Sequence, residues 1–170
     1  MENRLKEILS SIARDGSLSE EAVIGAKERQ KILAKPTGAL GRLEDISVQI
    51  AGITGKVKNK ITKKAIIIMS ADNGVVEEGV ASAPQSVTLS QTINFVRGLT
   101  GVSSIAKHFG IDLLVVDMGV KLPIPDSLYT DTPFEDGRLT KKILKRSIAR
   151  GTNNLAAGPA MTRDQALTAI

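Results

Sequence analysis

Two aspartates follow the two most apolar segments of the chain. Asp72 comes soon after residues 65–69 (AIIIM) and opens the run Asp-Asn-Gly, while Asp117 directly follows residues 113–116 (LLVV). If these segments are parallel strands, their carboxyl ends are where ligands of open α/β sheets bind. Carboxylates there can bind ribose hydroxyls, a metal ion or a proton. The alternative is structural, because Asp-Asn-Gly is strong turn chemistry. Both interpretations stay open for Asp72, and the structural one is favoured for Asp117.

A loop of small residues, 79–88 (GVASAPQSVT), follows the first of these segments. Small side chains let a flat ring approach the backbone, while Ser82 and Gln85 supply donors and acceptors that can orient it. The loop leads into a predicted helix, whose N-terminus favours anions. An ordinary loop with a serine cap has the same composition, so binding of a planar ligand is one of two interpretations.

Composition excludes several other kinds of site. The chain has no cysteine and one histidine, His108. Disulfides, thiolate nucleophiles and Cys-ligated metals are therefore excluded, and we expect neither a metal ion nor a cofactor. His108 falls in the last turn of a predicted helix, where its charged form stabilises the helix end. Familiar phosphate motifs also fail: neither apolar segment precedes G-x-G-x-x-G, and the glycine–lysine pair at 55–56 lacks the first P-loop glycine.

Helical patterns occupy the first 55 residues. Apolar residues recur at helical spacing over 5–12, and the run from Ser17 to Glu20 forms a capping-box pattern ahead of a second helix. That helix is predicted to end near Ala34, because Pro36 disfavours helical geometry in the residue before it. A third helix has an apolar stripe and a glycine terminator: Leu43, Ile46, Ile50, Ile53 and Gly55.

From Ala65 onward the pattern becomes one of buried strands separated by helices. Two helices, near 88–97 and 102–109, lie between the two apolar segments, which predicts a right-handed parallel crossover. A third strand is indicated around 143–148. We therefore predict an α/β fold with a parallel, doubly wound (Rossmann-like) sheet, incomplete in this chain, and an N-terminal helical subdomain. Residues 1–55 are assigned to the helical part of a small domain, and 56–170 to the N-terminal portion of an α/β nucleotide- or base-binding domain.

The end of the chain predicts a longer protein. Thr162 and Gln165 fit a capping box that opens a helix, yet the sequence ends at Ile170 after about two turns without a C-terminal cap. Two buried strands, with a third indicated, also make a thin sheet for a doubly wound fold. We expect the 170 residues to be a fragment; a short natural C-terminal helix is the alternative.

The charge of the chain limits its partners. The formal net charge is +5, with basic residues clustered over 56–64 and 138–150. Only 2% of residues are aromatic, so base-stacking platforms are scarce and a nucleic-acid role is disfavoured. Anionic phosphate substrates would also be attracted by this charge. A charged N-terminus and short apolar stretches indicate neither a secretory leader nor a membrane span, and we expect a cytoplasmic protein.

Five segments, taken together and in order, resemble the nicotinate-nucleotide:dimethylbenzimidazole phosphoribosyltransferase family of cobalamin biosynthesis. They are residues 35–44 (KPTGALGRLE), 71–75 (ADNGV), 82–88 (SAPQSVT), 97–102 (RGLTGV) and 150–163. The resemblance implies transfer of the ribose 5-phosphate of nicotinate mononucleotide to 5,6-dimethylbenzimidazole, which yields α-ribazole 5′-phosphate and nicotinate. It also implies a doubly wound sheet and a homodimer.

The resemblance assigns substrate-binding roles to five residues. Ser82 and Gln85 would contact the aromatic base, Pro84 would shape the pocket wall, and Asp72 and Gly74 would form the floor of the crevice. The catalytic glutamate of the family and its phosphate-binding Gly-Glu-x-Gly segment have no match within 1–170, so no catalytic residue is assigned. We expect the full-length protein to be a pentosyltransferase and this segment alone to be inactive.

Two other functions remain as alternatives. One is a noncatalytic module that binds benzimidazole-like ligands or α-ribazole through the same loop. The other, less favoured, is a basic nucleic-acid-binding protein, whose affinity would fall steeply with salt.

Overall fold

The structure is a computed structural model that describes residues 2–15 and 18–170. It divides into two compact units, Met1–Thr62 and Lys63–Ile170, and each unit is described by itself. The assignment of functional domains to 1–55 and 56–170 stays a prediction. No helix in the described ranges has the length and apolarity needed to cross a membrane.

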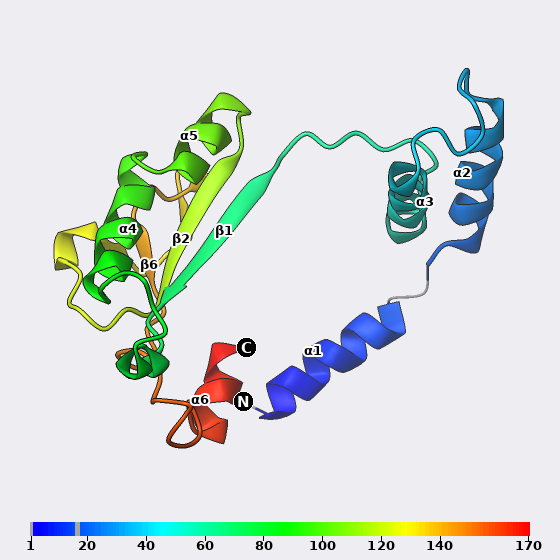
Figure 1. Ribbon diagram of the computed structural model, residues 1–170. Helices are drawn as coiled ribbons and strands as arrows, with labels where there is room; N and C mark the ends of the chain where they lie inside the picture. Colours follow the sequence, from blue (N-terminus) through cyan, green and yellow to red (C-terminus); the bar gives the residue numbers. More distant parts are fainter. Residues whose placement is uncertain (1, 16–17) are drawn as a thin grey trace. The chain divides into compact units, whose positions relative to one another are not determined.

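The first unit is helical, as predicted (Figure 1). The hydroxyl of Ser19 caps the second helix by accepting the Ala22 N–H at 3.2 Å. Ser17, the predicted cap, lies outside the described residues, and the helix begins at Glu20. Gly55 ends the third helix in the left-handed conformation, at φ 67°, as predicted. The helices are α1 (Glu2–Asp15), α2 (Glu20–Ile32) and α3 (Arg42–Thr54).

The core between α2 and α3 is built from small residues. Ala22, Ala26 and Ala51 are buried in one cluster, and the partly buried Val48 packs against it. The predicted apolar stripe of α3 mostly lies outside this core: Leu43 is 63% exposed and Ile53 is 66% exposed. Alanine-mediated packing therefore joins the two helices, and most of the stripe remains uncovered.

An ion pair closes the 35–44 loop between α2 and α3. Lys35 Nζ lies 2.7 Å from Glu44 Oε1, and both side chains are largely shielded from solvent. The same carboxylate accepts the Leu40 N–H at 3.0 Å. The hydrogen bond from Lys35, followed by that from Leu40, lowers the pKa of Glu44 below its ordinary value. The first family-like motif thus contains a lysine and a glutamate that hold its two ends together.

The second unit contains a four-stranded parallel sheet in the order β1-β2-β6-β3. Helices α4 and α5 connect β1 to β2 and cover the same side of these strands (Figure 1). The α/β class, the parallel sheet and the N-terminal helices are therefore confirmed. The elements are β1 (Ala65–Ala71), α4 (Ser86–Arg97), α5 (Gly101–His108), β2 (Asp112–Gly119), β3 (Tyr129–Thr130) and β6 (Ile143–Lys145).

Several short elements complete this unit. Strands β4 (Phe134–Glu135) and β5 (Arg138–Leu139) form a hairpin whose two-residue turn, Asp136-Gly137, has positive φ at both positions. Such a turn matches the twist of antiparallel strands. The capping box predicted at Thr162 is present and opens the last helix. The other elements are η1 (Gly74–Glu78), η2 (Asp126–Leu128) and α6 (Arg163–Ala169).

The two faces of the sheet are covered unequally. On the α4 and α5 side, Val115 and Ile143 anchor the core. On the opposite side Leu144 clusters with two residues of β2, but the neighbouring β1 residues Ile67 and Met69 are 58% and 67% exposed. We expected β1 to be a buried strand, and this is wrong for the described residues because both crossover helices lie on one side and leave alternate side chains of β1 exposed.

Candidate functional site

A pocket of about 330 Å³ opens where β1 leaves the sheet. Asp72, only 4% exposed, lies in its wall, and one of its carboxylate oxygens accepts the Lys121 N–H at 2.8 Å. Most of the remaining wall is aliphatic, from η1 and the small-residue loop. The volume lies within the range of small-molecule sites, which combine apolar walls with a few polar groups. The lining residues are Ala71, Asp72, Asn73, Val75, Val76, Val80, Ala81, Ala83, Pro84, Gln85, Val87 and Thr88.

The structure brings together three of the five residues predicted to bind substrate. Asp72, Pro84 and Gln85 all line the pocket. Gln85 directly precedes α4, is partly buried, and its side chain donates or accepts no hydrogen bond that the structure describes. Ser82 is exposed and does not line the pocket, although both of its chain neighbours do. Gly74 is buried and also lies outside the lining.

Gly74 instead packs against residues 150–163, called the late loop here, which the sequence motifs marked only as a family-like segment. Its N–H donates to Thr152 Oγ1 at 3.1 Å, and the Thr152 N–H donates to the Asp72 carbonyl at 3.0 Å. Gly151, at φ 84°, brings its backbone against Asp72. These contacts of the late loop fix the backbone of Asp72. The role of Thr152 was not predicted from the sequence, where its only signal was membership of the 150–163 segment.

Asp117 does not share this pocket. It is 2% exposed, and its Oδ1 accepts the N–H groups of Gly119 and Val120 at 2.9 and 2.8 Å. Its Oδ2 accepts the Tyr129 hydroxyl at 2.5 Å. Because both carboxylate oxygens have internal donors, the structural interpretation fits Asp117. This carboxylate fixes the turn after β2 and ties it to β3.

The environment of Tyr129 predicts an unusual titration. Burial, and then the hydrogen bond to Asp117 and the charge of that carboxylate, raise the pKa of Tyr129 above its ordinary value. The neutral phenol is therefore favoured by folding. This stabilisation is fully present below the unfolded pKa of about 10 and is lost as pH rises through the higher folded pKa. We expect Tyr129 to ionise in step with alkaline unfolding.

The ionisation of Tyr129 can be measured without overlap from other residues, because the chain has one tyrosine and no tryptophan. Near-ultraviolet absorbance would report tyrosinate formation while far-ultraviolet circular dichroism reports folding. The Tyr129→Phe variant should remove the absorbance signal and weaken the stability loss above pH about 10. Ionisation near pH 10 in a fully folded chain would contradict this prediction.

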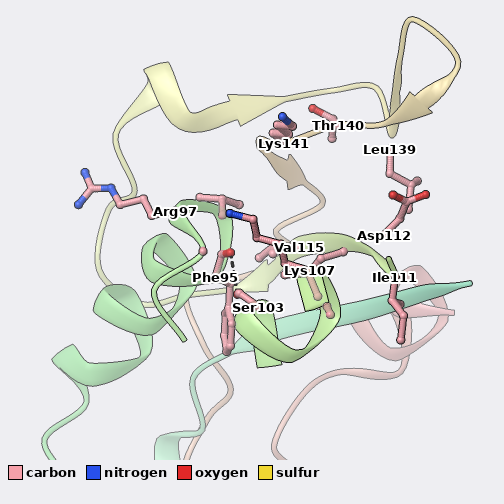
Figure 2. A pocket seen from close by; sticks show the side chains of 14 residues that line it. Phe95, Arg97, Ser103, Lys107, Ile111, Asp112, Val115, Leu139, Thr140 and Lys141 are labelled. Atoms are coloured by element: carbon pink, nitrogen blue, oxygen red, sulfur yellow. Dashed lines mark hydrogen bonds between the residues drawn. The ribbon is translucent and has the colours of Figure 1, made fainter. Parts of the chain in front are cut away.

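A second pocket, of about 410 Å³, lies at the opposite end of β2 (Figure 2). The C-terminal ends of α4 and α5 contribute to its wall, where the hydroxyl of Ser103 donates to the Phe95 carbonyl at 2.9 Å. Arg97, Lys107 and Lys141 add positive charge. Helix C-termini disfavour anions, and ligands of open α/β sheets bind at the other end of the strands. The pocket at the carboxyl end of β1, lined by Asp72, Pro84 and Gln85, is therefore the candidate site.

The histidine and the acidic residues give no sign of a metal centre. His108 is the last residue of α5, and its ring packs edge-on against Phe109 with centroids 4.9 Å apart. In the part of the chain that the structure describes, no three metal-ligating side chains gather.

Comparisons with known proteins agree with the sequence motifs. A family model described as "Phosphoribosyltransferase" matches residues 16–170. The nicotinate-nucleotide–dimethylbenzimidazole phosphoribosyltransferase of Clostridium perfringens is 45% identical over 162 residues, which are 95% of this chain and 40% of the relative. The protein of the same name from Alkaliphilus metalliredigens is 44% identical over 168 residues, 99% of this chain and 44% of the relative.

The fold agrees as well. The crystal structure of the Thermus thermophilus protein of this name matches with a TM-score of 0.75 and 36% identity, over 89% of this chain and 42% of that chain. The chain thus spans about 40% of the length of the curated relatives it matches. Motif order, sequence identity and sheet topology agree, and the chain belongs to the nicotinate-nucleotide:dimethylbenzimidazole phosphoribosyltransferase family.

Proposed function

We propose that this chain forms the base-binding part of an enzyme that transfers ribose 5-phosphate from nicotinate mononucleotide to 5,6-dimethylbenzimidazole. The products are α-ribazole 5′-phosphate and nicotinate. The observation that carries this proposal is the pocket at the end of β1, where Asp72, Pro84 and Gln85 come together within a chain of this family. The cysteine-free composition suits the reducing cytoplasm, where we place the enzyme, and we propose that it acts as a homodimer.

The chemistry requires a flat base held at attack distance. A nitrogen of dimethylbenzimidazole attacks C1′ of the mononucleotide as the bond to the nicotinate ring nitrogen breaks, with its electrons leaving on nicotinate. The aliphatic wall of the pocket suits the faces and methyl groups of such a base. The Gln85 side chain makes no hydrogen bond among the described residues, so it can orient a ring nitrogen, and Asp72 supplies a carboxylate in the pocket wall. Ser82 would contact the bound base from the rim.

Binding of dimethylbenzimidazole to the 170-residue chain tests the pocket. Gln85→Ala should weaken binding about 2- to 10-fold, the effect of losing one neutral hydrogen bond. Gln91→Ala is the matched control, because Gln91 is exposed on α4, the helix that Gln85 precedes, and lies outside the pocket lining. Isothermal titration calorimetry would measure both. Equal affinities for the two variants would contradict the assignment of Gln85.

We infer that this chain alone does not complete the reaction. After transfer, the attacking base must lose its N–H proton to a general base, and the family glutamate that fits this task has no match within 1–170. The expected result is ligand binding without nicotinate release when the chain is mixed with nicotinate mononucleotide and dimethylbenzimidazole. Turnover by the 170-residue chain would refute the inference.

A noncatalytic binding module is the second candidate. It is favoured by one observation, namely that the pocket at the end of β1 is lined entirely by residues of this chain. Such a module would bind α-ribazole or the free base at full affinity without any added polypeptide. Nicotinate release after addition of the remaining family sequence would favour the enzyme instead.

A further inference from the structure

The short helix η1 is hydrogen-bonded to the late loop at both of its ends. At its first residue, the Gly74 N–H donates to Thr152 Oγ1 at 3.1 Å. At its last residue, Glu78 Oε1 accepts a hydrogen bond from Asn154 Nδ2 at 2.6 Å. The two residues of the late loop that make these contacts are separated in the sequence by Asn153 alone. One short stretch of the late loop therefore holds both ends of η1.

The side chain of Asn154 is also fixed by contacts within the late loop. Its Oδ1 accepts the Ala156 N–H at 3.0 Å, which forms an Asx turn. Its backbone carbonyl accepts the N–H groups of Ala157 and Gly158 at 3.1 and 3.2 Å. Because Oδ1 takes part in the turn, Nδ2 is the atom that faces Glu78. The acceptor there is a carboxylate, and such charge-assisted hydrogen bonds are stronger than those between neutral groups.

The part of η1 between these two contacts forms part of the pocket wall. Val75 and Val76 line the pocket, and both are partly buried. Glu78 is exposed and lies outside the lining, so its effect on a ligand passes through the wall. A 3-10 helix of five residues has poor internal hydrogen-bond geometry and depends on its surroundings for a fixed position. The contact between Glu78 and Asn154 therefore helps to fix where the two valines lie.

The two valines supply the kind of surface that methyl groups on a flat base require. Each methyl group buried against an aliphatic wall strengthens binding by about 4-fold. A wall that moves away from the base loses this gain, whereas a base without methyl groups has less to lose. The position of Val75 and Val76 therefore determines how strongly the pocket prefers a methylated base.

We propose that Glu78 and Asn154 are positioning residues that set the preference of the pocket for methyl-substituted benzimidazoles over benzimidazole itself. The inference rests on the proposed function, because it requires a flat base in the pocket at the end of β1. With the contact formed, the late loop holds Val75 and Val76 against the methyl groups of 5,6-dimethylbenzimidazole. Without it, η1 keeps its hydrogen bond at Gly74, and the end that carries Glu78 is released from the late loop.

Isothermal titration calorimetry of the 170-residue chain with both bases tests the proposal. The parent chain should bind 5,6-dimethylbenzimidazole at least about 10-fold more tightly than benzimidazole, because two methyl groups are buried. Glu78→Ala should reduce this ratio at least about 3-fold, mainly by weakening binding of the dimethyl base. Glu77→Ala is the matched control, because Glu77 is the neighbouring exposed carboxylate on η1. Among the described residues, the Glu77 side chain makes no hydrogen bond or ion pair.

Exchange of the donor and the acceptor separates this contact from general destabilisation. Asn154→Asp keeps an acceptor for the Ala156 N–H but places two carboxylates opposite each other, so the ratio should fall as in Glu78→Ala. Glu78→Gln keeps an acceptor oxygen and should retain the parent ratio. When Glu78→Gln and Asn154→Asp are combined, the introduced amide can donate to the introduced carboxylate, and the ratio should recover. Far-ultraviolet circular dichroism would check that each variant folds.

Three results would overturn the inference while leaving the proposed function in place. The first is equal binding of both bases by the parent chain. The second is the same ratio for Glu78→Ala as for Glu77→Ala. The third is a combined variant whose ratio is no better than that of Asn154→Asp alone. If the parent chain binds neither base, the proposed function of the pocket fails, and this inference fails with it.

Discussion

Replacement of Gly74 by alanine is expected to lower the free energy of unfolding by about 3 kcal/mol, at the upper end of overpacking effects. A Cβ at this position would lie 2.5 Å from Asn153 C and 2.6 Å from both Asn154 N and Thr152 O. All three neighbours are backbone atoms, so no side chain can rotate away. The late loop must move, and with it the Thr152 N–H that holds the Asp72 carbonyl.

Two measurements follow from this displacement. Urea unfolding monitored by circular dichroism should show the loss of stability, and calorimetry should show weaker binding of dimethylbenzimidazole because Asp72 loses its support. Gly158→Ala provides the control from the same loop, where an added Cβ meets no atom within 4 Å. That variant should stay within about 0.5 kcal/mol of the parent chain. Equal stability of the Gly74 and Gly158 variants would show that the loop does not press on Gly74.

Asp117→Ala is the second substitution with a large expected effect. It leaves three donors without an acceptor: two backbone N–H groups and the Tyr129 hydroxyl. Each buried donor without a partner costs roughly 1–3 kcal/mol, so the free energy of unfolding should fall by at least about 3 kcal/mol. The loss should be seen in urea unfolding at neutral pH.

Graded variants separate the contributions to this site. Asp117→Asn retains one oxygen acceptor and should cost less than the alanine variant, while Tyr129→Phe removes a single donor and should cost about 1 kcal/mol. Asp131→Ala, at an exposed aspartate, should change stability by less than about 0.5 kcal/mol. If Asp117→Ala were as mild as Asp131→Ala, the turn after β2 would not depend on this carboxylate.

Both substitutions act beside the candidate site rather than on bound substrate. Gly74 and Thr152 fix the backbone of Asp72, and Asp117 fixes the turn that precedes Lys121, whose N–H binds the Asp72 carboxylate. Within the pocket, the Gln85 side chain makes no hydrogen bond among the described residues. This division is expected of a binding site, where a rigid support leaves polar groups free for a ligand.

The sequence alone determined the features that depend on near neighbours in the chain. Helical periodicity, the Gly55 terminator and the Thr162–Gln165 capping box are set by contacts three or four residues apart, and all three are present in the structure. Five motifs in the family's order were sufficient to identify the family to which the chain belongs. The same local signals could have found the β4–β5 hairpin, because Asp136-Gly137 is a favoured two-residue turn. The structure describes Ser19 as the cap of the second helix, and the sequence pattern by itself does not distinguish one serine of this run from another.

Only the tertiary structure decided which distant residues meet. Gly74 and Thr152 are 78 positions apart, and no spacing rule predicts that the late loop supports Asp72 in the pocket wall. Ser82 satisfied the motif as well as Gln85 did, yet only Gln85 lines the pocket. Gln85 directly precedes α4, whereas Ser82 lies in the exposed part of the loop. An apolar strand sequence predicts burial, but packing partners determine which of its faces is covered. In β1, both crossover helices lie on one side, and the other side remains open.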